Sequence, residues 1–441
     1  MQELRDILSF SFDIDCTPGG PAQRRGQDFL ERHAPDQLGW PADFDPLPLI
    51  LKASEWGLIR RGVQQRALAA NRFLKDFYGA GEAVSTDILG PEAAMQLGGT
   101  ATEMFGCQPP DGLHLHAFSA RLVQTESGEF QFLDHDCSLD CRFARILLNR
   151  EAQRRAMADI SWQDHLLAPL DPSDVYRSLF PAYADSSIIF APDDRTDVTA
   201  SILADALRLG TAGRNYLAVH DARLLVQTPE GQVKISALLR PTVEDHLLDP
   251  LGHDSSPTHG VAGLATIARA GKVAIINPKG SALCDNRAVF AAMPELIRFY
   301  LGEEPVLNNV PLSMPAGPDT PASPWATENF PAAIRNAYRP DRSSKRSRLF
   351  RSPGSARQSM TKSGHYTIEP VPRRMKAHPY ADERGIIQCR PLELTVFAFV
   401  NAEGAHILPG GIATAETQLG AIWRFDDRAR PREKDVWVLG D

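Results

Sequence analysis

The sequence predicts an α/β protein with α+β portions, built from several lobes around a central, mostly parallel sheet covered by helices. Two observations carry this prediction. The 441 residues are too many for one ordinary hydrophobic core, which favours two or three lobes. Between residues 187 and 311, apolar runs of strand length alternate with segments of helical spacing, as expected for strands joined by helical crossovers.

Residues 260–286 are the most informative part of this region. The first part has apolar residues at helical spacing and ends at Gly271, and Val273–Ile276 is a short apolar run typical of a strand covered on both faces. Gly280 and Ser281 follow the strand, where ligand loops lie in open α/β sheets. The stretch is either a ligand-binding unit or a packed helix and strand with no ligand.

The N-terminal part is predicted to hold a wrap and a first lobe. Residues 1–43, rich in Pro, Gly and Arg, are expected to lie loosely over the fold. In the lobe at residues 44–160, apolar residues from Trp56 to Phe77 predict an amphipathic helix that Gly79 ends. Alternating residues on both sides of a Ser-Gly turn then predict a β-hairpin, with a loop and a helix after it.

The C-terminal part is predicted to hold a sheet lobe, an insert and a final β segment. Residues 186–311 form the α/β sheet lobe, and residues 379–441 read as a hairpin followed by a short last strand. Between them, residues 312–378 are rich in Pro, Ser and Arg and show no sustained period, which predicts a flexible insert. Its basic run, Arg339–Arg351, is either a solvated linker or a contact for an acidic partner or RNA.

Composition excludes several classes of protein. A formal net charge of -8 argues against a general nucleic-acid binder, because phosphate contacts need a basic surface. The chain has neither an apolar run of membrane-spanning length nor a secretion signal, and its six cysteines are scattered, so we expect a cytoplasmic location and reduced thiols. The His and Cys residues between 114 and 141 match no zinc signature.

Several segments resemble one family in the same order. They are DPLPLILKASEWGLIRRGVQQRALAANRFLKDFYG, LHLHAFSARLV, LLDPLGHD, GVAGLATIARAGKVAIINPKGSAL, FYLGEEPVLNNVP, the PGG of HILPGG, and KDVWVL. With these segments, which cover most of its length, the chain resembles the circularly permuted ATP-grasp type 2 family of carboxylate-amine ligase-like proteins. The expected fold is therefore a circularly permuted, multi-lobed ATP-grasp.

The resemblance implies ATP and Mg²⁺ as cofactors and a ligase that joins a carboxylate, activated as an acylphosphate, to an amine. Such chemistry needs cationic groups on the phosphates and acidic or amide oxygens on magnesium. The substrates would be a small-molecule or peptide carboxylate and an amine. In bacteria the implied protein partners are an all-helical protein and a transglutaminase-like protease.

The resemblance also implies site residues. The candidate catalytic residues are Arg240, Asn277 and Lys434, and the candidate metal ligands are Asp134, Asp136 and Asp435. The candidate cofactor-binding residues are Asn149, Arg150, Asp249, Gly280, Ser281, Glu369, Gly410 and Gly411. Structural alternatives exist: Asp249 as a helix cap or turn former, the glycine pair as a hairpin turn, and Lys434 with Asp435 as an exposed ion pair.

The chain departs from the family at charged positions. Where the family has a glycine-rich phosphate loop, this chain reads LDHDCSLDCRFARILLNR. The arginines that the family has in the segment LTVFAF and in the loop after PGG fall on Thr395 and Thr414. Losing a phosphate-binding lysine and two arginines should weaken ATP binding by roughly 1.5 to 3 kcal/mol for each bond. Three hypotheses follow: a working ligase, a non-catalytic paralogue that acts as a binding or assembly subunit, and a module that binds nucleic acid through the basic run.

Overall fold

The computed structural model describes residues 20–33, 43–85, 88–89, 97, 104–137, 139, 141–158, 171–182, 184–190, 198–240, 261–312, 332–336, 348–350, 366–370, 375–381, 387–415 and 432–439. Statements about the structure below concern these residues.

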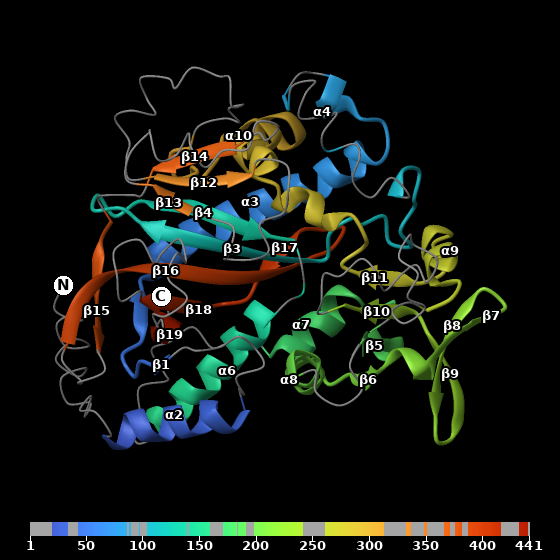
Figure 1. Ribbon diagram of the computed structural model, residues 1–441, viewed down its shortest axis with the longest axis horizontal. Helices are drawn as coiled ribbons and strands as arrows, with labels where there is room; N and C mark the ends of the chain where they lie inside the picture. Colours follow the sequence, from blue (N-terminus) through green and yellow to red (C-terminus); the bar gives the residue numbers. More distant parts are fainter. Residues whose placement is uncertain are drawn as a thin grey trace.

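A large sheet forms the centre of the described structure (Figure 1). Its main path runs β1-β19-β18-β16-β3-β4, β15 and β17 pair with β16, and β2 pairs with β19. The strands are β1 Asp43–Phe44, β2 Leu49–Leu51, β3 Ala117–Gln124, β4 Phe130–Asp136, β15 Ala377–Ala381, β16 Ile387–Val400, β17 Ala405–Ile407, β18 Gly411–Ala415 and β19 Arg432–Val438. Only β1 and β2 run parallel to their neighbour among these strands. The prediction of a mostly parallel central sheet is therefore wrong for the larger sheet.

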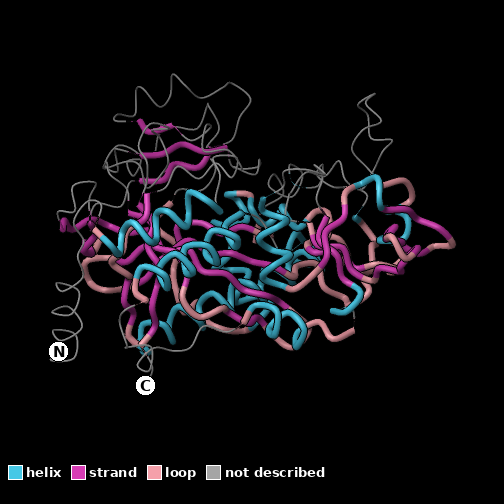
Figure 2. Tube along the Cα trace, turned by 90° about the horizontal axis from the view of Figure 1, so that it is seen from below, coloured by secondary structure: helices cyan, strands magenta, loops and turns pink. Residues whose placement is uncertain are grey.

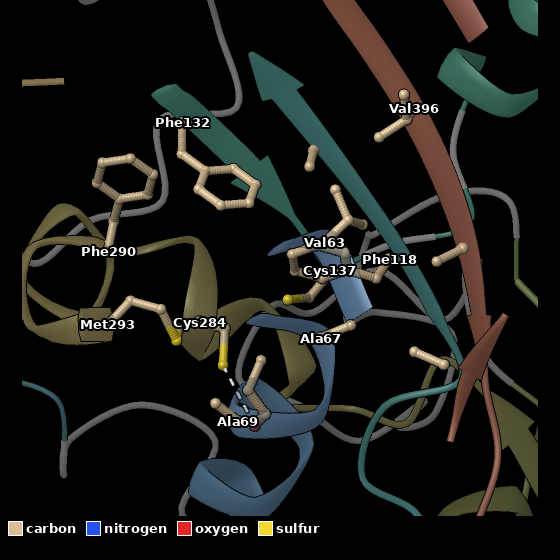
Figure 3. Close-up of a cluster of buried hydrophobic side chains, with 14 of the residues drawn as sticks. Val63, Ala67, Ala69, Phe118, Phe132, Cys137, Cys284, Phe290, Met293 and Val396 are labelled. Carbon is tan, nitrogen blue, oxygen red and sulfur yellow. Dashed lines mark hydrogen bonds between the residues drawn. The ribbon is translucent and has the colours of Figure 1, made fainter. Parts of the chain in front are cut away.

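One face of this sheet is apolar and packs against two helices. Helix α3 (Ala53–Phe77) ends close to the predicted position, and α10 (Arg287–Leu301) lies beside it. Figure 3 shows Val63 of α3 next to Phe118 of β3, with Phe132 and Phe290 facing each other nearby. These side chains are almost fully buried, and each such burial contributes roughly 1.5 to 3 kcal/mol.

The other face is covered by α6 (Cys141–Ala156), on which α2 (Pro21–His33) packs from outside. Figure 1 shows the two helices stacked below the sheet. Arg25 of α2 donates from Nε to the carbonyl of Arg155 (3.1 Å) and from Nη2 to that of Ala156 (2.9 Å). A guanidinium at these carbonyls suits the negative end of the α6 dipole. Part of the predicted loose wrap is thus an ordered helix.

A smaller, four-stranded sheet lies to the right of the large one in Figure 1. Its order is β11-β10-β5-β6, all parallel, with β5 Ser187–Phe190, β6 Gly210–Ala212, β10 Ala237–Leu239 and β11 Ala274–Ile276. Alternate residues enter two hydrophobic clusters, one on each face. The helices of this region are α7 (Pro172–Leu179), α8 (Val198–Leu207) and α9 (Leu264–Arg269). The predicted doubly covered strand at 273–276 and the helix before it are confirmed.

Two three-stranded antiparallel sheets complete the described fold. Strands β7 (Leu217–His220), β8 (Arg223–Thr228) and β9 (Gly231–Ile235) extend outward beyond the parallel sheet. Strands β12 (Ala332–Asn336), β13 (Arg348–Phe350) and β14 (Tyr366–Pro370) lie within the predicted flexible insert and sit apart from the body in Figure 2. The insert therefore contains a sheet that the composition did not predict.

Short elements connect these units: α4 (Glu82–Ser85), η4 (Ala184–Ser186), η5 (Arg214–Tyr216) and η7 (Ser281–Asp285). None of the helices in the described part of the chain combines the length and the apolar character that crossing a membrane requires.

Candidate functional site

Charged side chains gather on the α6 side of the large sheet. Because side chains alternate between the two faces of a strand, strand register decides which of them share a face. Arg121 lies opposite Asp134 in β4 and opposite Thr395 in β16. We call this surface the polar face; its members are Ser119, Arg121, Asp134, Asp136, Glu393, Thr395, Thr414, Glu433 and Asp435.

Helix α6 supplies three arginines to the polar face. The ion pairs join Arg142 to Asp136, Arg145 to Glu433, and Arg150 to Asp435. The N···O distance is 2.6 Å in the first pair and 3.7 Å in the third. Phe143 stacks on Phe397 with ring centroids 4.1 Å apart, which fixes the helix over β16. Two predicted metal ligands, Asp136 and Asp435, are therefore each held by an arginine.

Arg121 holds two further carboxylates. Its Nη1 is 3.3 Å from both carboxylate oxygens of Glu393, and its Nη2 contacts Asp134. From the other side of the sheet, Arg287 Nη1 lies 3.0 Å from Asp134 Oδ1. The third predicted metal ligand is thus bound by two guanidinium groups.

Asp435 is almost completely buried. Burial raises its pKa, and this effect is opposed by Arg150, by the backbone N–H of Val436 and by the indole of Trp437, whose Nε1 donates to Oδ2 over 2.9 Å. Arg150, Val436 and Trp437 therefore stabilise the ionised carboxylate, while burial disfavours the ionised form.

Arg150 contacts the turn that contains the glycine pair, Gly410 and Gly411. Arg150 Nη2 donates to the carbonyl of Pro409 over 2.7 Å, and Gly410 follows with φ +86°. A Cβ on Gly410 would lie 2.6 Å from the Val436 carbonyl, and one on Gly411 would clash with the Thr395 carbonyl. The two glycines are required for close packing of β18 between its neighbours, whatever else they contact.

Asn149 lies on α6 one position before Arg150. Its side chain is fully buried, and neither atom of its amide has a hydrogen-bond partner within the described structure. Its predicted cofactor-binding role stays a prediction.

Lys434 points away from the polar face. It lies in β19 next to Asp435, so the two side chains are on opposite faces of the sheet. Lys434 Nζ is 2.8 Å from Asp45 Oδ2 and donates to the carbonyl of Pro379 over 2.6 Å. The alternative of an exposed ion pair between Lys434 and Asp435 is wrong, because both side chains are buried and have other partners.

Arg240 and Asn277 connect the parallel sheet to the β3–β4 hairpin. Arg240 donates from Nε and Nη2 to the Asn277 carbonyl at 3.0 and 2.8 Å. The Asn277 amide accepts from the N–H groups of His116 and Ala117 and donates to the carbonyls of Ala117 and Cys137, all at 2.7–2.8 Å. All four hydrogen-bonding positions of this amide are therefore used by the backbone.

The Gly280 loop is packed in the same way. Ser281 Oγ donates to the Cys137 carbonyl over 3.0 Å, and Tyr78 Oη donates to the Gly280 carbonyl over 3.0 Å. Gly280 has φ +87°, and a Cβ there would lie 2.5 Å from Tyr78 Oη. The structure brings Arg240, Asn277, Gly280 and Ser281 together, and both Asn277 and Ser281 donate to the carbonyl of Cys137, the residue after Asp136.

Two predicted cofactor-binding residues remain, Asp249 and Glu369. Asp249 falls outside the described residues, as does most of the basic run Arg339–Arg351. Glu369 lies in β14, where its backbone pairs with Ala333.

Sequence reasoning missed Arg121, Glu393, Glu433, Arg142 and Arg145. One signal was available: Arg121 and Glu393 each interrupt an apolar strand, and a charged residue inside such a strand needs a buried partner.

A comparison with models of protein families shows to which family this chain is related. The model described as circularly permuted ATP-grasp type 2 matches residues 48–415. The chain belongs to this family.

An uncharacterized protein of Synechocystis sp. is 28% identical over 276 residues, which are 60% of this chain and 57% of that protein. An uncharacterized protein of Mycobacterium leprae is 27% identical over 282 residues, 61% of this chain and 49% of that protein. The chain spans about half the length of these relatives.

A solved structure shows the same architecture. The glutathione synthetase-like effector from Globodera pallida, in its apo form, matches with a TM-score of 0.56 over 94% of this chain and 96% of that chain. At 10% identity the likeness shows the ATP-grasp fold alone.

The ATP-grasp family implies ATP and Mg²⁺, and the candidate metal ligands Asp134, Asp136 and Asp435 all lie on the polar face. Within the described part of the chain, no three His, Cys, Asp or Glu side chains are grouped so that they could hold a metal ion. Asp134, Asp136 and Asp435 each form an ion pair with arginine, and Mg²⁺ would have to displace these guanidinium groups. The donor set present does not fit Mg²⁺ without that rearrangement.

Proposed function

We propose that this chain is a non-catalytic ATP-grasp protein that acts as a binding or assembly subunit for a partner protein. The observation that carries the proposal is the pairing on the polar face. Five carboxylates, at Asp134, Asp136, Glu393, Glu433 and Asp435, are held by four arginines, at 121, 142, 145 and 150. Groups that would bind Mg²⁺ and phosphate are thus used to bind each other.

The position of the other candidate residues supports the same proposal. Lys434 lies on the apolar side of the sheet with Asp45, and Arg240 is bound to the Asn277 carbonyl. A phosphate would have to compete with these contacts for either cation. The partners consistent with the family are a neighbouring ligase, an all-helical protein or a transglutaminase-like protease.

The competing function is an ATP-dependent carboxylate-amine ligase, in which Asp134, Asp136 and Asp435 would bind Mg²⁺. One observation favours it: the sheet face has kept charged residues, although buried ion pairs rarely add stability over well-packed apolar residues. Under this alternative, the arginines would release the carboxylates when MgATP binds.

Calorimetric titration with MgATP separates the two functions. We expect no binding heat up to millimolar MgATP, for the unaltered protein and for Asp435→Asn alike. Micromolar binding that Asp435→Asn abolishes would contradict the proposal and support the ligase. Arg154→Gln is the matched control, because Arg154 pairs with Glu151 on the exposed side of α6.

A further inference from the structure

Arg121 lies at the centre of three adjacent strands. It is in β3, with Asp134 directly opposite in β4, while Glu393 in β16 is a diagonal neighbour two positions from Thr395. The register of β3 and β4 shifts between Arg121 and Leu122. A β-bulge of this kind turns a side chain away from its regular direction, and such bulges are common beside active sites.

The two carboxylates converge on one guanidinium. Glu393 meets Nη1 at 3.3 Å with both of its oxygens, and Asp134 meets the neighbouring Nη2. The side chains are 12%, 5% and 15% exposed for Arg121, Glu393 and Asp134. Burial alone would lower the pKa of Arg121, but Glu393 and Asp134 outweigh it and hold the pKa above its ordinary value.

Two largely buried carboxylates that share one position need either a cation between them or a proton on one of them, because like charges at short range repel strongly where water is limited. In proteins Mg²⁺ and similar ions meet this need, often with one or two carboxylates and several waters. In this chain the requirement is met by Arg121.

We propose that the Arg121 guanidinium is a built-in cation that takes the place of a divalent metal between Asp134 and Glu393. This inference rests on the proposed function, since it identifies the residue that prevents metal binding on the polar face. The other three arginines come from α6, whereas Arg121 belongs to the sheet that carries both carboxylates. Arg121 contacts both carboxylates, whereas Arg287 pairs with Asp134 from the other side of the sheet.

Replacing Arg121 tests the proposal directly. Arg121→Ala removes the charge and opens space, and Mn²⁺ binding is measured by electron paramagnetic resonance of the free ion. We expect this variant to bind one Mn²⁺ at least about tenfold more tightly than the unaltered protein does. Arg121→Lys keeps a cation in place and should not gain the site. Adding Asp134→Asn and Glu393→Gln to Arg121→Ala should abolish it.

Three results would count against the proposal. A folded Arg121→Ala protein that binds Mn²⁺ no better than the unaltered protein overturns the proposal. Equal gain of binding by Arg121→Lys overturns it too, because position and charge would then be irrelevant. If Arg121→Ala is unfolded, Mn²⁺ should restore its circular dichroism spectrum, and failure to do so counts against the proposal.

Failure of this inference can be separated from failure of the proposed function. Tight MgATP binding by the unaltered protein would refute the non-catalytic role, whatever the variants do. Absence of MgATP binding together with no Mn²⁺ gain in Arg121→Ala would refute only the role of Arg121.

Discussion

The ammonium of Lys434 lies 2.8 Å from Asp45 Oδ2, and both side chains are almost completely buried. Asp45 also accepts from the N–H groups of Leu47 and Ala381 at 2.9 and 3.3 Å, so this ion pair connects β19 to the segment between β1 and β2 and to the end of β15. Lys434, a predicted catalytic residue, therefore has a structural role in the described fold.

Breaking the pair should therefore cost stability. We expect Lys434→Met to lower the free energy of unfolding by about 3 to 5 kcal/mol, because it leaves a buried carboxylate without its cation. The double variant with Asp45→Asn should recover part of this loss. Urea denaturation measures both, and a stability loss under 1 kcal/mol in the single variant would show that the pair is not a structural requirement.

The environment of the buried His135 predicts that the fold loses stability in acid. Its Nδ1 lies 3.2 Å from Arg66 Nη1, a donor, and its Nε2 lies 2.7 Å from the Cys284 carbonyl, an acceptor. The neutral ring with its proton on Nε2 satisfies both contacts. Burial, and next the charge of Arg66, lowers the pKa of His135 from 6.5 to about 4.

Because the folded pKa lies below the unfolded one, the unfolded chain binds more protons between these values, and stability falls as pH falls from 6.5 towards 4. The loss from His135 should reach about 3 kcal/mol near pH 4, at 1.36 kcal/mol per unit of pKa. His135→Gln, with a carbonyl and an amide, should reduce this slope. An unchanged pH dependence of unfolding would argue against a buried neutral ring.

Sequence reasoning predicted the elements that depend on local pattern. The α3 helix, the β3–β4 hairpin with the helix after it, and β11 each follow from spacing and from glycine positions within one segment. It did not predict the polar face, because that face joins β3 and β4 to strands more than 250 residues later in the chain. Register between such distant segments leaves no local signature.

The separation of Lys434 from Asp435 could have been predicted from the sequence. The segment KDVWVL was predicted to be a strand, and neighbouring residues of a strand point to opposite faces. Lys434, a candidate catalytic residue, and Asp435, a candidate metal ligand, could therefore not point into one site. The resemblance assigned both by position along the chain, and strand geometry separates them.

Gly280 offers a test of the packing of its loop. Gly280→Ala must adopt φ +87° and place a Cβ 2.5 Å from Tyr78 Oη. Gly302 is a matched control, because it has φ +67° but nothing within 4 Å of a Cβ. Gly302→Ala should cost roughly 1 to 2 kcal/mol for the left-handed backbone alone.

Gly280→Ala should cost more than this control, because Tyr78 would also have to move, which would disturb its 3.0 Å hydrogen bond to the Gly280 carbonyl. Thermal unfolding of the two variants measures the difference. Equal melting temperatures would mean that Tyr78 does not restrict the loop.

Asn277 gives the sharpest contrast between a ligand contact and a structural bond. Asn277→Asp keeps the shape of the side chain and both accepted hydrogen bonds, but removes the two donated to the carbonyls of Ala117 and Cys137. The Cys137 carbonyl keeps Ser281 Oγ as a donor, whereas the Ala117 carbonyl loses the donor from Asn277. A buried carbonyl left without a donor costs about 1 to 3 kcal/mol, so the variant should lose at least about 1 kcal/mol of stability. Asn401→Asp is the control, because Asn401 Oδ1 accepts from Glu403 and Gly404, and a carboxylate accepts equally well. If Asn277→Asp unfolds at the same urea concentration as the Asn401 variant, the amide does not stabilise the contact between the parallel sheet and the hairpin. The prediction that Asn277 is a catalytic residue would then regain support.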